Sequence, residues 1–461
     1  MHPVSQAAKT ATPAPPALWR SYLAMLAPML ATNALQMASG TLDGIFLGQM
    51  LGVQAIAAVS AFFPAFFLLL ALVIGLSTGA TVLIGQAWGA RRPEAVRAVA
   101  GTAIALVLAA GAVVAVAGTL LAPALLRALG TPPAVLGEAV RYARLMFLGS
   151  PLIFLLWLTT SMSRGVGDAR SPLWTLGVAT TVAMLCTPAL VRGWGGLPQL
   201  GVAAAAVSTQ LAYALALAWT ARRWCRSGHP LAPTRQLLRQ VRLDAGTVGR
   251  ILRIGIPSSL QMLTMALAEI VLLGLVNRHG QQATAAYGAV NQVMGWVQLP
   301  AMSAGIAATV LSAHAIGAGR PARVLAIVRT GLWLNLAVTG AAVCAVLAFS
   351  PWAMALFLTD GPTLALAQDL LRTVAWSVVL LGAANVLVGA MRASGTVLWP
   401  AALGMAAILA IELPFAHWLH GRIGITAIWW AYALGFGAML VLQALYFQRV
   451  WRRRLAAAPA R

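Results

Sequence analysis

Residues 54–87 read QAIAAVSAFFPAFFLLLALVIGLSTGATVLIGQA and contain no charged residue. About 20 apolar residues suffice for one helix to cross the hydrocarbon core of a bilayer, so this stretch predicts a long transmembrane helix. The rest of the chain is similar, because 61% of its 461 residues are hydrophobic and only 9% are charged. A soluble domain carries about a quarter charged residues. The composition therefore excludes a water-soluble protein and predicts an integral membrane protein.

Apolar runs separated by Arg, Gly and Pro predict twelve membrane-spanning helices. Arginines cluster after the even-numbered spans. This pattern predicts that both termini lie on the cytoplasmic side of a bacterial-type inner (plasma) membrane. The net charge of +22 is explained by this topology. We expect no nucleic-acid partner, because a nucleic-acid binder carries its basic residues on a polar surface. The predicted spans are 21–48, 54–87, 97–121, 135–160, 172–191, 200–221, 250–276, 283–315, 323–349, 364–389, 397–417 and 424–448.

The chain repeats itself with a shift of 228 residues: Gly52 recurs as Gly280, and Gly89-Ala90 as Gly317-Ala318. A six-span unit returns to its starting side, so an axis along the membrane normal should relate the two copies. We therefore expect an all-α polytopic protein with two six-helix lobes, the arrangement of many secondary transporters. The expected units are a disordered cytoplasmic tail (1–20), an N-lobe (21–222), a basic cytoplasmic linker (223–248), a C-lobe (249–449) and a basic cytoplasmic tail (450–461).

Three carboxylates, Asp43, Glu269 and Glu412, fall inside apolar runs. An ionised group there costs about 3 kcal/mol or more unless it is hydrated or paired. Asp43 and Glu269 lie on polar stripes of the equivalent first and seventh spans, so each lobe contributes one carboxylate that can exchange a proton or a cation. Each could instead serve only as a hydrogen-bonding group between helices, and the role of Glu412 stays open. The substrate-binding candidates are Asn33, Gln36, Gln261, Met265, Asn291 and Gln298.

Other motifs fail to indicate an enzyme. Cys186, Cys225 and Cys344 lack the spacing of a disulfide framework or a metal site, and the only lysine is Lys9, so no Walker A loop exists. The segment 75–79 matches the nucleophile-elbow pattern but lies inside an apolar helix, which favours small-residue packing. His314 could join a proton relay or make a core hydrogen bond. We expect no catalytic site, no metal and no cofactor.

Several motifs resemble those of the multidrug and toxic compound extrusion (MATE) transporters. Asp43-Gly44-Ile45-Phe46-Leu47-Gly48 resembles the end of that family's first span, and Gly85-Gln86-Ala87-Trp88-Gly89-Ala90 resembles part of its second. Arg164-Gly165-Val166-Gly167-Asp168 and Met391-Arg392-Ala393-Ser394-Gly395 resemble the ends of its fourth and tenth spans. The likeness covers about residues 20–450.

The resemblance implies a monomer in the lipid bilayer that exports amphipathic, often cationic, small molecules in exchange for H⁺ or Na⁺. Asp43 resembles the family's first-span cation-site residue, and Glu269 the seventh-span acidic residue of one bacterial branch. The fifth span departs from the family pattern, with Ala183 and Thr187 where Asn and Asp often precede Pro. The tenth span has no carboxylate between Trp376 and Ala390. Because Na⁺ favours several oxygen ligands, these departures favour H⁺ as the coupling ion.

Two other functions are compatible with a membrane protein of this kind. A flippase for lipid-linked saccharides would share the repeat, but it handles an anionic pyrophosphate and should line its cavity with Arg or Lys, whereas the central charges here are acidic. A membrane-embedded enzyme would need a set of catalytic groups inside the membrane, and the sequence shows none.

Overall fold

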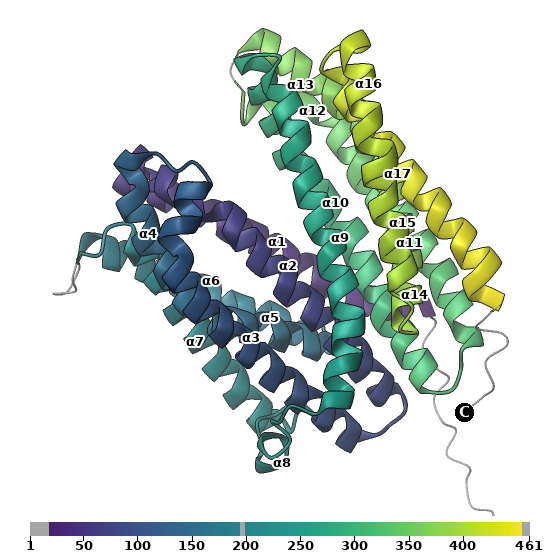
Figure 1. Cartoon of the computed structure of the whole chain (residues 1–461). Helices are drawn as coiled ribbons and strands as arrows, with labels where there is room; N and C mark the ends of the chain where they lie inside the picture. The colour runs from purple at the N-terminus through teal and green to yellow at the C-terminus, as the bar shows by residue number, and fades with distance from the viewer. Residues whose placement is uncertain (1–17, 194–198, 359, 454–461) are drawn as a thin grey trace, which may run out of the picture.

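The computed structural model describes residues 18–193, 199–358 and 360–453, without the side chains of Asp43, Leu47 and Val53. Most of the two predicted tails, 1–20 and 450–461, lies outside these residues. The described part of the chain is built of helices that form two lobes (Figure 1). The lobes meet at one end of the molecule and diverge at the other, so the whole has the shape of a V.

The helices fall into two series joined by a connecting segment. The N-lobe has six membrane-spanning segments when α1 is included and the bent pair α4 and α5 is counted as one segment. The C-lobe also has six segments, because α13 and α14 together form one segment, and α15 and α16 together form another. The N-lobe helices are α1 (Leu18–Leu51), α2 (Val53–Gly89), α3 (Pro93–Ala128), α4 (Pro133–Leu148), α5 (Ser150–Gly165), α6 (Arg170–Arg192) and α7 (Ala203–Ser227). The short α8 (Arg235–Leu238) lies in the connection. The C-lobe helices are α9 (Ala245–Asn277), α10 (Gln281–Gly317), α11 (Ala322–Ala348), α12 (Ser350–Ala355), α13 (Gly361–Val374), η2 (Ala375–Ser377), α14 (Val378–Ala393), α15 (Leu398–Ala406), η3 (Ala407–Glu412), α16 (Leu413–Ile423), α17 (Thr426–Tyr446) and η4 (Phe447–Trp451).

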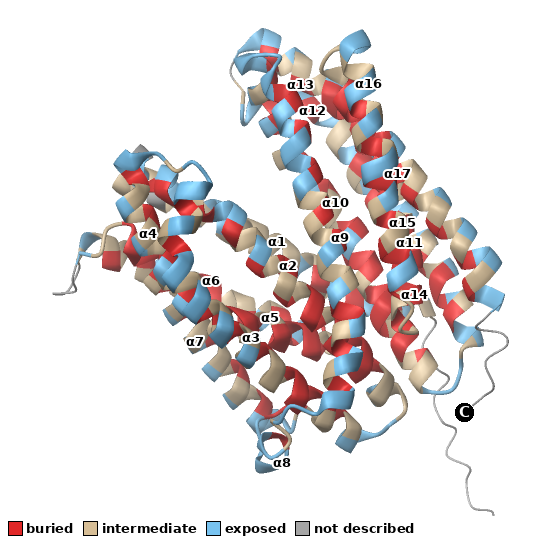
Figure 2. Ribbon diagram, viewed as in Figure 1, coloured by how far each residue is buried: buried red, intermediate tan, exposed pale blue. Residues whose placement is uncertain are grey.

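The apolar surface of the molecule is typical of a membrane protein. Among the described residues, ten helices are long and apolar enough to cross a membrane, and the bent pair α4 and α5 makes eleven. Large apolar side chains such as Leu120, Leu185 and Trp333 are more than 60% exposed on the outer faces of the lobes. Buried residues lie mainly on the inward helix faces (Figure 2). The predicted fold class, an all-α polytopic protein with two six-helix lobes, is confirmed.

Three predicted spans are interrupted by a bend or by a turn that is not α-helical. The span predicted at 364–389 contains the 3-10 turn η2. The span predicted at 135–160 consists of α4 and α5, which are bent by 51° next to Pro151. The span predicted at 397–417 extends to Ile423 and contains the π-helix η3. Proline has no N–H, and its ring clashes with the carbonyl four residues earlier, which for Pro414 is Ala410 inside η3. The wider π turn accommodates that clash.

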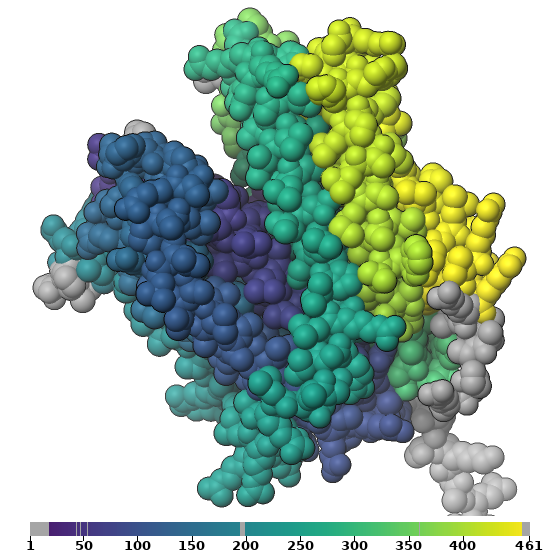
Figure 3. Space-filling model, viewed as in Figure 1, coloured from purple at the N-terminus to yellow at the C-terminus, as the bar shows by residue number. Residues whose placement is uncertain are grey.

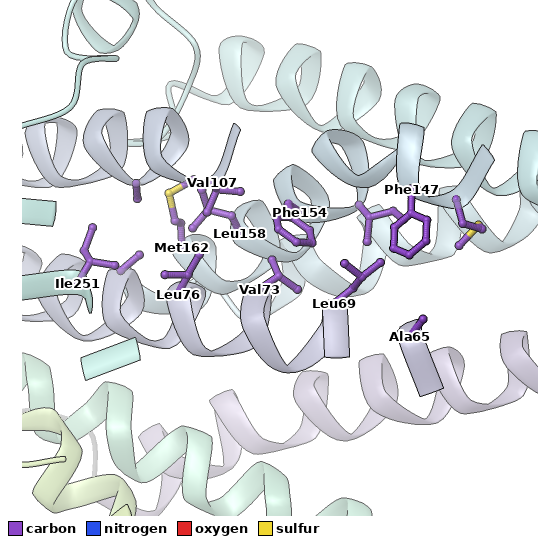
Figure 4. Close-up of a cluster of buried hydrophobic side chains, with 14 of the residues drawn as sticks. Ala65, Leu69, Val73, Leu76, Val107, Phe147, Phe154, Leu158, Met162 and Ile251 are labelled. Carbon is purple, nitrogen blue, oxygen red and sulfur yellow. The ribbon is translucent and has the colours of Figure 1, made fainter. Parts of the chain in front are cut away.

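Each lobe's first helix also packs into the core of the other lobe. Ile251 and Ile254, from the start of α9, belong to the same buried cluster as Val73 and Phe154 of the N-lobe (Figure 4). The first turns of α1 belong to a C-lobe cluster, and the hydroxyl of Tyr22 donates to the carbonyl of Ala304 at 2.6 Å. The two lobes are therefore joined by reciprocal packing at the end where they meet.

That end carries the loops after α2, α5, α7, α10 and α14, and we call it the basic end because of their arginines (Figure 1). Gln86 donates through Nε2 to the carbonyl of Ala393, 2.7 Å away. His314 makes the equivalent contact, with 2.7 Å between Nε2 and the carbonyl of Gly165. A carbonyl only accepts, so Nε2 of His314 carries a hydrogen. A shift of 228 residues relates Gln86 to His314 and Gly165 to Ala393. The two hydrogen bonds therefore join equivalent positions of the two lobes. We call these four residues the crossed seal.

A second contact at the basic end fixes the start of the segment between the lobes. Asp168 accepts hydrogen bonds from the backbone N–H of Arg170 and the hydroxyl of Ser171, and its carboxylate lies 3.4 Å from Nε2 of His229. Burial opposes ionisation, but the neighbouring ring of His229 and the hydrogen bonds from Ser171 and the backbone outweigh it and hold the pKa of Asp168 well below its usual range. Trp224 stacks on His229 and donates to Ser171.

Replacing Asp168 by Asn is expected to lower the free energy of unfolding at pH 7 by about 1–3 kcal/mol, because charge-assisted hydrogen bonds are lost. A carboxylate with a lowered pKa stabilises the fold above its ordinary pKa of about 4, and this contribution falls as the pH drops below that value. The difference from the natural chain should therefore shrink in acid. Thermal unfolding in detergent measures it. The exposed Asp369, changed to Asn, is the control, and an equal effect there would contradict the assignment.

Candidate functional site

The C-lobe contains a cavity of about 220 Å³ between α9, α10, η3 and α17. Glu269 lies in its wall on α9, and Glu412 in its wall on η3. The other walls are mainly apolar and aromatic, with two side-chain amides among them. These lining residues include Met265, Asn291, Met294, Gln298, Trp429, Tyr432, Phe436 and Met439. The cavity therefore combines two acidic groups with a mostly apolar lining, the usual make-up of a small-molecule site.

The two carboxylates differ in their exposure. Glu269 is exposed, whereas Glu412 is 4% exposed, so Glu269 lies nearer the mouth of the cavity and Glu412 at its inner end. Among the described residues, neither takes part in an ion pair. The carboxylate of Glu412 lies directly against Gly435 of α17, where any side chain would collide with it. Gly435, which has no side chain, therefore leaves the space that the carboxylate of Glu412 occupies.

The aromatic wall comes from α17 and α10. The hydroxyls of Tyr287 and Tyr432 are 3.0 Å apart, which fixes the ring of Tyr432 beside the cavity. Trp429 is 1% exposed, and its indole N–H has no hydrogen-bond partner within the described part of the chain. A buried polar group without a partner is rare in a native protein. This N–H is shielded from water, so Trp429 contributes its ring, and not the N–H, to the cavity wall.

The cavity borders the cleft between the lobes. Gly295 lines the cavity, and a β-carbon placed there would lie 2.7 Å from the terminal carbon of Met37 on α1. The first helix of the N-lobe thus passes close to the rim of the C-lobe cavity. The space-filling view shows the open cleft between the blue N-lobe and the green helices of the C-lobe (Figure 3). A ligand can therefore approach from the open end of the V.

The structure brings together four of the residues proposed from the sequence: Glu269, Met265, Asn291 and Gln298. Gln261 is buried beside Gly404 and does not line the cavity. The backbone of Asp43 lies in α1, but its side chain is outside the described part of the structure.

The two polar candidates of the first span lie between or beside the lobes. Asn33 donates through Nδ2 to the hydroxyl of Ser303 at 3.0 Å, which joins α1 to α10. Gln36 is half-buried on α1. Neither lines the C-lobe cavity, so the amides of the two equivalent helices do not form one site in this conformation.

The sequence left Glu412 undecided and did not single out the aromatic wall. The available signal was Pro414, two residues after an acidic residue in an apolar run, because a proline at that point disturbs the helix. Nothing in the spacing of Trp429 and Tyr432 separates them from ordinary core or interfacial aromatics. Their place beside the cavity depends on the packing of α17 against η3 and α10.

Comparisons with known proteins agree with this architecture. The sequence matches the MatE family model over residues 28–188 and 257–418, one match in each lobe. It is 38% identical over 445 residues to the probable multidrug resistance protein YoeA of Bacillus subtilis, covering 95% of both chains. It is 28% identical to the multidrug resistance protein NorM of Burkholderia vietnamiensis, covering 94% of this chain and 95% of that one.

Solved structures show the same fold. A multidrug resistance MATE family transporter described in an outward-facing conformation superimposes with a TM-score of 0.86 over 95% of this chain and 96% of that one. Its sequence identity is 22%, so this likeness concerns the fold alone.

Proposed function

This chain belongs to the MatE family of membrane transporters, and on that premise we propose that it exports amphipathic, cationic compounds in exchange for H⁺. The observation that supports the proposal most is the C-lobe cavity, where two unpaired carboxylates stand among apolar and aromatic walls. Acidic groups attract a cation, and an apolar lining accommodates the body of an amphipathic molecule. Two relatives named as multidrug resistance proteins are consistent with it.

The residues that line the C-lobe cavity also favour export of cations over transport of lipid-linked saccharides. A site for an anionic pyrophosphate needs Arg or Lys, whereas neither is among the described residues that line the C-lobe cavity. The cavity is therefore better suited to a cationic than to an anionic substrate.

In the proposed orientation the basic end lies on the cytoplasmic side of the inner membrane, in agreement with the positive-inside rule. The crossed seal then closes the cytoplasmic side while the cleft opens outward. The transporter acts as a monomer, and alternating access requires these interlobe contacts to break and re-form.

Exchange follows from competition for carboxylates. Asp43 in the N-lobe and Glu269 in the C-lobe take up protons on the outer side and release a cationic compound there. After the lobes change orientation, proton loss to the cytoplasm restores negative charge and the next cation binds. Two ligands whose binding excludes each other are thereby coupled. No cofactor takes part beyond the coupling ion, H⁺, with Na⁺ as the alternative.

Reconstituted protein in proteoliposomes tests the proposal. An imposed pH gradient is expected to drive ethidium transport, and an imposed Na⁺ gradient of equal size is expected to drive little. Asp43→Asn should lower pH-driven transport at least tenfold, because Asn cannot carry the proton. Full drug-driven proton exchange by Asp43→Asn would overturn the role of Asp43, and transport driven by Na⁺ alone would overturn proton coupling.

A further inference from the structure

The π-helix η3 gives one carboxylate an unusual setting. Glu412 is the last residue of η3, and a continuous α-helix through the same segment would rotate its side chain to a different face. Pro414 follows that π turn, which accommodates its clash with the carbonyl of Ala410, and Gly435 leaves the space into which the carboxylate fits. Single π turns inside α-helices occur frequently at functional sites. Two separate features of the sequence thus direct Glu412 into the cavity.

Burial of this carboxylate is costly without a partner. Glu412 is 4% exposed, and no described basic residue lies within ion-pair distance of it. An isolated buried charge costs several kcal/mol unless a counter-charge or hydrogen bonds compensate for it. The compensating charge has room in the cavity that Glu412 lines. The buried carboxylate therefore indicates that the cavity is built to receive a positively charged ligand.

The size and chemistry of the cavity favour an organic cation over a metal ion. One water occupies about 30 Å³ of liquid volume, so a cavity of about 220 Å³ is much larger than a dehydrated ion needs. Within the described residues, no group of three or more His, Cys, Asp or Glu side chains could hold a metal ion. Hard metal cations favour six or more oxygen ligands.

The remaining walls suit an organic cation with an apolar body. Trp429, Tyr432 and Phe436 present aromatic rings, whose faces attract a cationic nitrogen. Met294 and Met439 add flexible, polarisable side chains that adapt to ligands of different shape. A quaternary or aromatic ammonium compound matches both the negative charge and these surfaces.

We propose that Glu412 is a ligand-binding carboxylate that anchors the cationic nitrogen of an organic ammonium compound at the inner end of the C-lobe cavity, with Glu269 at its mouth. This inference rests on the proposed export of cationic compounds and assigns the C-lobe cavity as one place where they bind. Glu412 takes the position of an anchor, whereas Glu269, being exposed, is accessible to the cleft. Gly435 is a positioning residue, because it contacts Glu412 and sets the location of the carboxylate.

Isothermal titration of the purified full-length protein in detergent with benzyltrimethylammonium tests the site. Glu412→Gln is expected to weaken binding by roughly 30-fold or more, the loss expected when one partner of a desolvated charge pair is neutralised. Gly435→Ala keeps every charge but displaces the carboxylate, and it should also weaken binding. Glu94→Gln, an exposed carboxylate at the start of α3, is the control and should bind as the natural chain does.

Size-exclusion elution and the unfolding temperature establish whether each variant is folded. If Glu412→Gln does not fold, the binding measured for Gly435→Ala decides the proposal. Unchanged binding in a folded Glu412→Gln or Gly435→Ala would overturn the proposal. A heat signal that depends on Glu412 with NaCl, and none with benzyltrimethylammonium, would also overturn it by assigning an inorganic cation.

The outcomes for the site and for the transport function are separable. If binding depends on Glu412 but neither ion gradient drives export, the site stands and the proposed antiport fails. If binding and pH-driven export are both normal in Glu412→Gln, the antiport stands and the site assignment fails.

Discussion

Glu269→Gln is expected to reduce pH-driven ethidium export by a factor of about 10 to 100. The glutamine has nearly the same shape, but it can neither carry a proton nor attract a cation electrostatically. Glu269 is exposed at the mouth of the cavity, so its loss should be smaller than the about 2–5 kcal/mol of a fully desolvated charge pair; the factor of about 10 to 100 corresponds to about 1.4–2.8 kcal/mol. The measurement is ethidium movement across proteoliposomes together with the proton flux in the opposite direction.

Glu138 provides a matched control for this variant. It is a partly exposed carboxylate on α4 that pairs with Arg141 at 3.3 Å, outside the C-lobe cavity. Glu138→Gln should transport at the rate of the natural chain. Glu269→Asp keeps the charge and should retain more activity than the glutamine variant. Full coupled exchange by Glu269→Gln would contradict the proposed role of this residue.

Gly317→Leu is expected to force the basic end open. Gly317 of α10 lies against the backbone carbonyl of Gln86, and any β-carbon there would collide with it. The repeat makes the same contact in reverse, since Gly89 lies against the carbonyl of His314. Overpacking of this kind costs about 1–3 kcal/mol. That cost shifts the equilibrium toward separated lobes by roughly 5- to 160-fold, and export should fall because one half of the transport cycle is disfavoured.

Spin labels on the basic loops measure the opening. Cysteines at Arg92 and Arg320, two exposed positions related by the repeat, can be labelled after Cys186, Cys225 and Cys344 are replaced. The distance between the labels should increase in Gly317→Leu. Gly340→Leu is the control, because Gly340 is also inside a helix and has open space around it. An unchanged distance in Gly317→Leu would show that the crossed seal does not depend on this close contact.

Much of the fold follows from local properties of the sequence. In lipid, every backbone polar group must be satisfied within the chain, so a long uncharged run such as 54–87 has few choices besides a helix. The shift of 228 residues predicted two equivalent lobes, and the structure shows the same equivalence in detail. Gly52 and Gly280 both have a positive φ, of +77° and +92°, just before the second helix of each lobe.

The sequence was less informative about the breaks and the contacts between lobes. A proline in an apolar run signals a disturbance but does not say whether the chain bends, as beside Pro151, or forms a π turn, as before Pro414. The sequence likewise left open whether His314 serves a proton relay or a hydrogen bond. The structure gives it a hydrogen bond to the carbonyl of Gly165 in the opposite lobe.

Hydropathy and charge act over segments of about 20 residues, so the membrane environment, the helical class and the duplication could all be read from local sequence. Which polar residues share a site depends instead on how the helices pack. Glu269 and Glu412 are far apart in the chain, and they line one cavity only because α9, η3 and α17 pack together around it. Gln261 lies on the same helix as Glu269, yet it is buried against Gly404. The direction of a side chain depends on what the neighbouring helices leave empty, and no local pattern contains that information.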